Sequence, residues 1–347
     1  MGGGHLILLC YTCPVLFLGT CIEVFTPTLN TATRSKYRVQ FETHNKRFHI
    51  ENIKRGASVI ASAGSGKTES VVYQFLKHFQ HNQFCGIIHD YKNFELTEIA
   101  YPLFESTDIP FYTIAFDEVI HKVNPIAPRY LPNEESVNEV ARVLLENLLE
   151  QKEQVVTGSS KFFNDAAEGL LCGMIWRLKE DLPNLCTLPH MIALYQYLDT
   201  KQLVLWLSEN RTSRIMASAF ISGIDSEKQT AGVISTLANA LKRISTKRIF
   251  MALSADEVPL DLNNPKSPSV ISVVNNPKYE SAYSPVIATI LHTAIKQMSV
   301  RGQQSSFVMM EEAPTIRLLN MHRIPATLRS YDVATIYVMQ DKVQNDM

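Results

Sequence analysis

The sequence has no excess of charge of either sign, since its 33 lysines and arginines are balanced by 34 aspartates and glutamates. This balance argues against a protein that coats nucleic acid with a basic surface. Nucleic acid would have to be held by a local patch, or by a channel that an oligomer builds. Cysteine is scarce as well, with six scattered residues in 347 and one Cys-x-x-Cys pair that has no second pair to complement it. That usage disfavours a zinc site and is typical of reduced thiols in an intracellular protein.

The share of charged residues is low, at 19%, against 46% hydrophobic residues. Such a composition excludes a largely disordered chain and supplies a sizeable core. The length fits two domains, or one large α/β domain that carries an insertion.

Charge is missing altogether from residues 6–22 near the N-terminus. This run is just under the length of a comfortable membrane span, and Pro14 and Gly19 weaken it. No lysine or arginine precedes it, which argues against a secretory signal. By the positive-inside rule, the basic residues that follow place the rest of the chain in the cytoplasm; they are Arg34, Lys36 and Arg38. We predict a membrane anchor in residues 1–36, with a buried strand or helix as the alternative.

The rest of the chain divides into three parts by its periodicity. Residues 37–132 begin with two short strands around an asparagine-containing turn, and continue with strands that alternate with helices. Residues 133–247 show mostly helical periodicity, which predicts an inserted all-α subdomain. Residues 248–347 return to the alternation, with strands predicted at 248–253, 268–276, 305–314 and 333–340. This alternation predicts an α/β fold with a mainly parallel sheet.

One segment between a strand and a helix matches the phosphate-binding pattern G-x-x-x-x-G-K-[ST] in every defined position but the first. It consists of Ala61, Ser62, Ala63, Gly64, Ser65, Gly66, Lys67 and Thr68. The glycines let backbone N–H groups turn inward around phosphates. Lys67 would contact the β- and γ-phosphates and Thr68 the Mg²⁺ ion, at the positive end of the helix dipole. Ala61 ends a strand, where a Cβ is often tolerated. The alternative is a glycine-rich turn at a helix start.

A phosphate-binding loop needs an acidic partner at the end of another strand. Four apolar residues, 307–310, lead into Glu311 and Glu312. Glu311 would hold Mg²⁺, and Glu312 would orient or deprotonate the attacking water. The usual first acid is aspartate, and Glu311 is longer by one methylene. The alternative is two surface carboxylates at a strand end.

Two further residues belong to the last predicted strand. Gln340 at its tip is suited to sensing the γ-phosphate, and the alternative is a solvated strand end. Arg329 lies just before the strand, where a ring motor would use it to reach a neighbour's site; otherwise it is a solvated helix-end arginine.

Two groups of charged residues stay open from the sequence alone. Asp90 and Lys92 follow the second core strand and could lie near the nucleotide. A basic cluster could contact DNA phosphates or form a solvated helix end; it comprises Lys242, Arg243, Lys247 and Arg248.

Four segments, taken in order, resemble a known family: "RGASVIASAGSGKTES", "GIIHDYKNFELTEIAY", "FVMMEEAPTIRL" and "LRSYDVATIYVMQDKVQ". They look like the TraG/TraD coupling ATPases of conjugative type IV secretion, closest to the form found in Bacteroides-type mobile elements. The resemblance covers nearly the whole chain after Tyr37. Its most specific features are the acidic pair followed by Ala-Pro-Thr and the spacing from Arg329 to Gln340.

The resemblance implies a RecA-like motor that forms a homo-hexameric ring, with an all-α domain inserted in the nucleotide-binding domain. Such motors are anchored in the bacterial inner membrane with the ATPase domain in the cytoplasm. They connect the relaxase complex to the secretion channel, and use ATP and Mg²⁺ to move single-stranded DNA. The matching motifs carry over Lys67 and Thr68 as phosphate and Mg²⁺ contacts, Glu311 and Glu312 as the acidic pair, Gln340 as sensor and Arg329 as inter-subunit arginine.

The sequence departs from the family's pattern. Ala61 stands for the first glycine and Glu311 for aspartate, and the chain stops where the family continues with further strands. Its N-terminus holds at most one membrane span where the family usually has two or more, which suggests a fragment or a degraded copy. Two alternatives to the coupling motor therefore stay open. One is a double-stranded DNA translocase of the FtsK/HerA kind, and the other is a membrane adaptor that no longer hydrolyses ATP.

Overall fold

The computed structural model describes residues 36–42, 47–62, 64–149 and 158–340. Its centre is a sheet of six parallel strands. In spatial order they are β3 (Ala57–Ile60), β8 (Val333–Met339), β7 (Ser306–Glu311), β4 (Cys85–Asp90), β6 (Val270–Val274) and β5 (Phe111–Ile114). The four inner strands are buried along their whole length, as the near-continuous apolar runs of parallel strands require. The predicted parallel sheet is confirmed.

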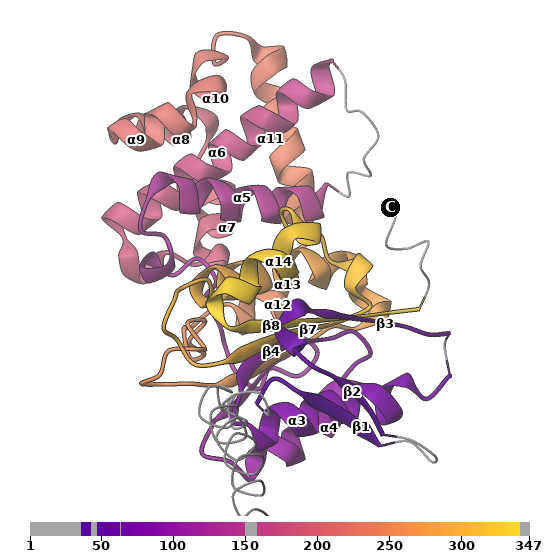
Figure 1. Cartoon of the computed structure of the whole chain (residues 1–347). Coiled ribbons are helices and arrows are strands. Elements are labelled where there is room, and N and C mark those ends of the chain that lie inside the picture. Colours follow the sequence, from indigo (N-terminus) through magenta and orange to yellow (C-terminus); the bar gives the residue numbers. More distant parts are fainter. Residues whose placement is uncertain (1–35, 43–46, 63, 150–157, 341–347) are drawn as a thin grey trace, which may run out of the picture.

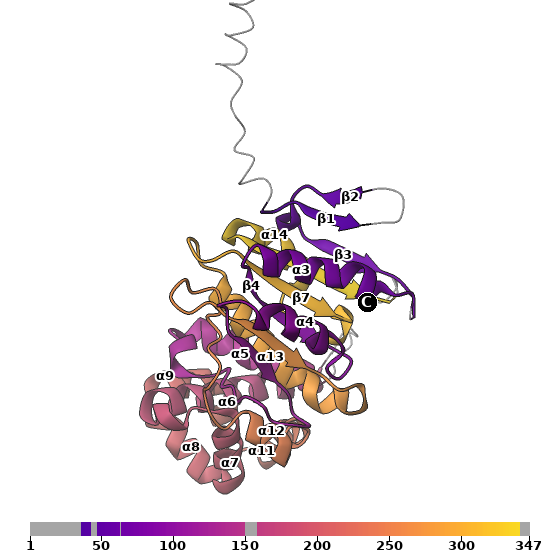
Figure 2. The ribbon, with the colours of Figure 1, turned by 90° about the horizontal axis from the view of Figure 1, so that it is seen from below.

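One face of the sheet is covered by α3 (Tyr73–His81), α4 (Glu95–Glu105) and a hairpin of β1 (Val39–Glu42) and β2 (Arg47–Ile50), as Figure 2 shows. The two strands that the sequence predicts here are present, and they pair antiparallel. Aromatic rings fill this layer, where Phe79 stacks on Phe307 with centroids 4.4 Å apart. Gly86 on β4 makes room for that ring, because a Cβ there would lie 2.5 Å from Phe307.

The opposite face of the sheet carries α13 (Glu280–Met298) and α14 (Ile324–Leu328), visible above the strands in Figure 1. Its apolar core runs without a break from Val308 and Met310 on β7, through Ile287 on α13, into the helices beyond. The helical part of the chain is therefore not a separate body with its own core. It shares one core with this face of the sheet.

The helical block lies between β5 and β6 in the chain, in agreement with the predicted insertion, while the domain boundaries stay predictions. It contains α5 (Glu134–Leu148), α6 (Ser159–Asp181), α7 (Leu188–Tyr197), α8 (Thr200–Ser208), α9 (Arg211–Met216), α10 (Ser218–Ser222), α11 (Glu227–Lys242) and α12 (Lys247–Ala252). Polar side chains cap most of them. Asn133 starts α5 by a capping box with Ser136, and Asp199 starts α8 in the same way with Gln202.

The strand predicted at residues 248–253 is wrong, because this segment forms most of α12. Thr246 accepts a hydrogen bond from the N–H of Ile249 and so caps a helix. Ile249 and Ala252 are then buried one turn apart. A short apolar run fits a strand or a buried helix equally well by periodicity, and the cap decides it here.

No described helix combines the length and apolar character needed to cross a membrane. The predicted anchor falls almost entirely on residues 1–35, which lie outside the described ranges.

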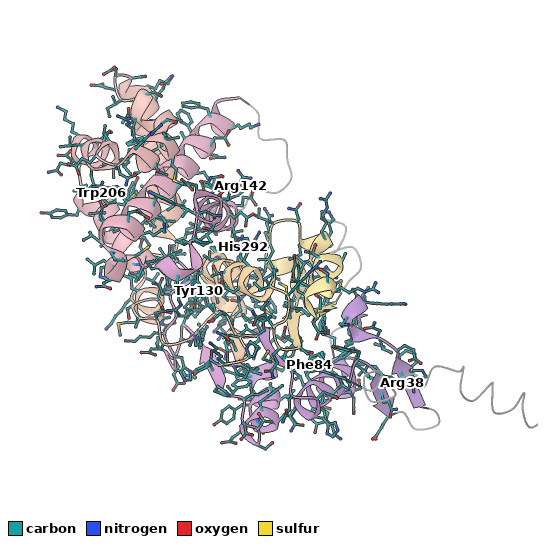
Figure 3. All side chains as sticks on the ribbon, turned by 60° about the vertical axis from the view of Figure 1, so that its left-hand side comes forward. Arg38, Phe84, Tyr130, Arg142, Trp206 and His292 are labelled. Carbon is teal, nitrogen blue, oxygen red and sulfur yellow. The ribbon has the colours of Figure 1, made fainter. Side chains whose placement is uncertain are left out.

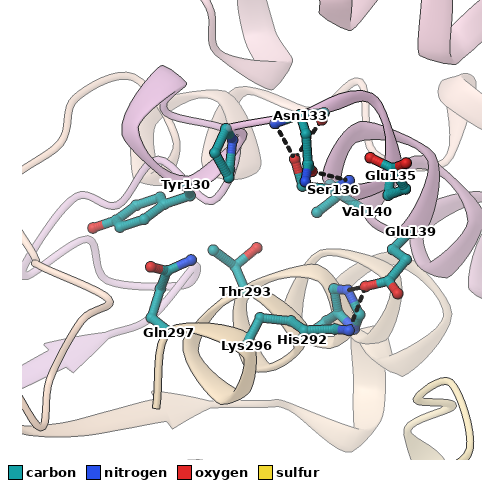
Figure 4. Close-up of a pocket in the computed structure, with 11 residues that line it drawn as sticks. Tyr130, Asn133, Glu135, Ser136, Glu139, Val140, His292, Thr293, Lys296 and Gln297 are labelled. Atoms are coloured by element: carbon teal, nitrogen blue, oxygen red, sulfur yellow. Dashed lines mark hydrogen bonds and ion pairs between the residues drawn. The ribbon is translucent and has the colours of Figure 1, made fainter. Parts of the chain in front are cut away.

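A groove of about 300 Å³ marks the joint between the helical block and the sheet layer (Figure 4). Figure 3 shows its residues Tyr130 and His292 between Trp206 of the block and Phe84 beside the sheet. On one side of the groove, Glu139 of α5 accepts from Lys296 Nζ at 2.6 Å and lies 3.6 Å from His292 Nε2. We call Glu139, His292 and Lys296 the junction cluster. The hydrogen bond with His292, followed by the contact with Lys296, lowers the pKa of Glu139 to about 2.

Candidate nucleotide site

The glycine-rich loop begins where β3 ends. The N–H of Ala61 donates to the carbonyl of Met339 at 3.2 Å, which ties the loop to the end of β8. Gly64 and Gly66 have φ angles of +72° and +73°, in the left-handed region that favours glycine. A Cβ at either residue would meet no atom within 4 Å, so backbone conformation and not space demands glycine there. Ala61 is absent from the described residues with positive φ, which explains why alanine is tolerated.

Lys67 and Thr68 lead from the loop into the helix. Lys67 is only 6% exposed, and its Nζ lies 3.5 Å from the carbonyl oxygen of Ala61, so the side chain folds back across the loop. Thr68 is the first of five residues, Thr68–Val72, that form a π-helical turn before α3 begins. Such widened turns are frequent at functional sites. Ala63 lies outside the described residues. The other loop residues precede this helical segment, and their contacts with a nucleotide stay a prediction.

Glu311 ends β7 at the same edge of the sheet. It is 1% exposed; Oε1 lies 3.1 Å from Lys92 Nζ, and Oε2 accepts from the N–H of Tyr91 at 3.2 Å. Burial raises the pKa of Glu311, and the ammonium of Lys92 opposes that rise. The neighbouring lysine thus supplies the positive charge that a buried carboxylate needs.

Glu312 has an unusual backbone, with φ 46° and ψ 51° in the left-handed region. A non-glycine residue there costs about 1 kcal/mol or more, and such strain tends to occur at functional sites. Its side chain is 4% exposed, and Oε2 has no hydrogen-bond partner among the described residues. A buried carboxylate oxygen without a partner is costly, and this one fits a polar ligand such as water or nucleotide.

Gln340 follows directly after Met339, whose carbonyl accepts from Ala61. The end of β8 therefore lies between the loop and the acidic pair, where a γ-phosphate sensor belongs. Arg329 is exposed at the other end of β8. Since β8 has seven residues, its two ends lie about 20 Å apart at 3.3 Å per residue, and Arg329 and Gln340 flank opposite ends of it. It cannot reach the site of its own chain, and any contact with a nucleotide would have to be made in a neighbouring subunit.

Lys92 belongs to the site, and Asp90 supports it. Asp90 is buried, and its carboxylate accepts from the N–H and hydroxyl of Thr97 at 2.8 and 2.6 Å. Asp90 thereby holds the first turn of α4 in place, and these contacts give it a structural role instead of a role in ligand binding. His89 is fully buried, donates from Nδ1 to the carbonyl of Glu311 at 2.9 Å, and stays neutral because burial lowers its pKa to about 4.

Sequence reasoning missed Glu95. Its Oε1 accepts from the hydroxyl of Thr68 at 3.1 Å, and its Oε2 lies 3.5 Å from Lys92 Nζ. The signal in the sequence is weak, because an acidic residue in the first turn of a helix is common wherever helices begin. Only the folded loop between β4 and α4 brings it to Thr68.

Two residues of the basic cluster bind protein groups. Arg248 pairs with Asp117, and its guanidinium lies over the ring of Tyr279. Arg243 donates to the carbonyl of Leu148. These contacts give both arginines a structural role, and they favour the structural interpretation over a DNA-binding one.

Known proteins match this chain by structure and not by sequence. Neither a protein-family profile nor a curated protein sequence matches the chain. Solved structures do match: the bacterial conjugative coupling protein TrwBdeltaN70, in complex with sulphate, has a TM-score of 0.65 at 11% identity over 84% of this chain. The chain has the fold of TrwB. It spans 64% of that TrwB chain.

Two more structures share this fold. TrwB in complex with ADP and Mg²⁺ has a TM-score of 0.63 at 12% identity, and covers 84% of this chain and 65% of its own. VirB4 of Thermoanaerobacter pseudethanolicus has a TM-score of 0.55 at 11% identity, and covers 88% of this chain and 77% of its own. The predicted RecA-like P-loop NTPase fold is thereby confirmed, as is the resemblance in fold to conjugative coupling proteins.

Proposed function

We propose that the chain is the ATP-driven motor part of a conjugative coupling protein. One observation carries this proposal: the ends of β3, β8 and β7 bring the loop, Gln340 and the acidic pair to one edge of the sheet. Ligands bind at the carboxyl ends of parallel strands in folds of this kind. That TrwB, which has the same fold, is found with ADP and Mg²⁺ supports a nucleotide at this edge.

The residues of the site fit Mg²⁺ and ATP in their chemistry. The left-handed glycines free backbone N–H groups for phosphates, and Lys67 adds a positive charge. Thr68 and Glu311 would hold Mg²⁺, which when bound neutralises charge on the transferred phosphoryl group. Glu312, with its free buried oxygen, would orient and deprotonate water. Gln340 would sense the γ-phosphate, and Arg329 would act on the neighbour's nucleotide in a homo-hexameric ring.

The partners follow from the resemblance of the sequence. We propose that the ring receives relaxase-bound DNA and passes single-stranded DNA to the components of a type IV secretion channel. The predicted anchor would hold it at the bacterial inner membrane with the ATPase part in the cytoplasm. That TrwB, a bacterial conjugative coupling protein, has this fold supports the context of conjugation.

The test is ATP hydrolysis by the purified chain, without DNA, with single-stranded DNA and with double-stranded DNA. We expect single-stranded DNA to stimulate hydrolysis. Lys67→Ala should lower the rate by about 100-fold or more, since it removes a charge aimed at the reacting phosphate. Lys77→Ala is the matched control, because Lys77 is exposed on the helix that follows the same loop.

The alternatives give different outcomes. Stimulation by double-stranded DNA alone would favour a translocase of the FtsK/HerA kind. Nucleotide binding without hydrolysis above the level of Lys67→Ala would favour the adaptor. Failure to bind nucleotide at all would overturn the proposal.

A further inference from the structure

Four side chains connect the loop to the acidic pair in a continuous chain of contacts. The hydroxyl of Thr68 donates to Glu95 at 3.1 Å, Glu95 lies 3.5 Å from Lys92, and Lys92 lies 3.1 Å from Glu311. We call Thr68, Glu95, Lys92 and Glu311 the site cluster. Thr68 and Glu311 stand at the two ends of this series of contacts, and they are the residues that would hold Mg²⁺. Lys92 and Glu95 therefore lie in the space between two expected metal ligands.

One basic side chain lies between the two acids of this series of contacts. Lys92 contacts both Glu95 and Glu311. A divalent cation held by Thr68 and Glu311 would repel the ammonium at this short range. Lys92 and Mg²⁺ consequently compete for the same acids.

The backbone around Lys92 is fixed while its side chain has room to leave. Asn93 and Phe94 have φ angles of 52° and 77°, two left-handed residues in succession. The N–H of Asn93 donates to the carbonyl of Asn275 at 3.0 Å, and Asp90 accepts from the N–H of Lys92 at 3.2 Å. The Lys92 side chain itself is 31% exposed, so its ammonium can move to solvent without a change of the loop.

We propose that Glu95 is a further acidic residue on the Mg²⁺ side of the nucleotide site, and that Lys92 is the cation that balances it until Mg²⁺ binds. The proposal rests on the proposed nucleotide function. It assigns Glu95 as a positioning residue: through its bond to the hydroxyl, it holds Thr68 toward the metal. Lys92 sets how much free Mg²⁺ is needed before nucleotide and metal bind together.

The competing role for Lys92 is a direct contact with a phosphate, and it predicts the opposite sign. A lysine that binds phosphate strengthens nucleotide binding with or without Mg²⁺. A lysine that competes with Mg²⁺ weakens the binding of Mg²⁺ and leaves metal-free nucleotide binding unchanged. The two roles are therefore separated by the dependence on Mg²⁺ and not by activity.

The experiment measures binding of a fluorescent, non-hydrolysable ATP analogue to the full chain across a Mg²⁺ titration. We expect Lys92→Met to lower the half-saturating Mg²⁺ concentration about three- to tenfold, the size of one partly buried ion pair. Glu95→Gln should raise it by a similar factor. Lys77→Met and Glu98→Gln, at exposed positions on α3 and α4, are matched controls and should titrate like the wild type. Thermal unfolding by circular dichroism checks that each variant is folded, and Lys92→Arg should restore the wild-type Mg²⁺ dependence.

Each other outcome has a distinct meaning. If Lys92→Met weakens analogue binding equally with and without Mg²⁺, the lysine contacts phosphate and the inference is wrong. If the wild type needs Mg²⁺ but both variants titrate as it does, the inference fails and the proposed function stands. If the wild type binds no more analogue than Lys67→Ala does, the proposed function itself fails.

Discussion

The site cluster and the junction cluster share one kind of contact, a lysine beside a glutamate, yet they differ in backbone. The junction cluster lies on regular helices, where His292 and Lys296 are one turn apart on α13 and face Glu139 on α5. In the site cluster, Lys92 lies on the loop after β4 and Glu311 ends β7, while Thr68 and Glu95 each begin a helical segment. Left-handed residues adjoin the cluster in the chain, namely Asn93, Phe94 and Glu312.

This contrast shows that residue composition alone does not distinguish an ion pair that joins two helices from one in the candidate nucleotide site. In the junction cluster, the described contacts satisfy Glu139 and lower its pKa. Near the site cluster, Glu312 keeps a buried oxygen without a partner and a strained backbone. A ligand that donates a hydrogen bond to Glu312 Oε2 would remove the cost of leaving that buried oxygen unpaired. The unpaired oxygen and the left-handed backbone therefore indicate the candidate site more clearly than charge does.

The largest expected effect comes from Glu312→Gln. Loss of the general base should lower ATP turnover by about 10²- to 10³-fold, while binding of nucleotide persists. At the same time the thermal unfolding midpoint should rise, because the substitution replaces a buried carboxyl group whose Oε2 has no hydrogen-bond partner among the described residues. ATPase assays and thermal unfolding measure the two effects. A fall in the unfolding midpoint would show that the carboxylate has a partner and that the contrast between the clusters is mistaken.

In the junction cluster, the corresponding substitution Glu139→Gln should lower stability, whereas Glu312→Gln should raise it. The pKa of Glu139 is lowered from its ordinary value of 4.5 to about 2, so its contribution is present above pH 4.5 and is lost as pH falls toward 2. Because the side chain is 39% exposed, solvent screening reduces that contribution to about 1 kcal/mol. Glu139→Gln should lower stability at pH 7 by this amount, and by less at pH 3, without a change in ATP turnover.

Urea unfolding at both pH values measures this effect. Glu135→Gln, one turn earlier on α5, is the control and should change little. An equal loss at pH 7 and pH 3 would mean that packing and not charge connects the two helices.

The smallest effect tests the backbone itself with one substitution at two places. Asn93→Gly relieves a left-handed residue and should raise stability by up to about 1 kcal/mol. Asn138→Gly, at an exposed position of α5, should lower it by about 0.3 kcal/mol, because glycine is the poorer helix former. Denaturant unfolding of the two variants side by side gives the signs. Two changes of the same sign would remove the backbone difference between the clusters.

Much of the fold and part of the site could be predicted from the sequence because their signals are local. The loop around Lys67 has a fixed spacing, and the apolar run before Glu311 places that acid at a strand end. Since parallel strands end at one edge, these two motifs had to come together. The hairpin and α6 likewise follow from short-range patterns.

The remaining features depend on loops and caps that a pattern does not encode. Glu95 reaches Thr68 only because residues 93 and 94 turn left-handed, and neither is a glycine that would signal this. Residues 248–253 form a helix because Thr246 caps it, against an apolar run that also suits a strand. Arg329 was placed correctly before β8, but its distance from its own site follows only from the length of that strand.

The pairing of β3 with β8 also determines when the glycine-rich loop can take its place during synthesis of the chain. Ala57 lies opposite Ile336, so the loop strand must wait for a partner that is translated long after it. Contacts between such distant segments form late, because closing the long intervening loop costs entropy. Until β8 has left the ribosome, the N–H of Ala61 has no carbonyl of Met339 to seat it. A nascent chain that already carries Lys67 therefore lacks the contact that holds the start of the loop against the sheet.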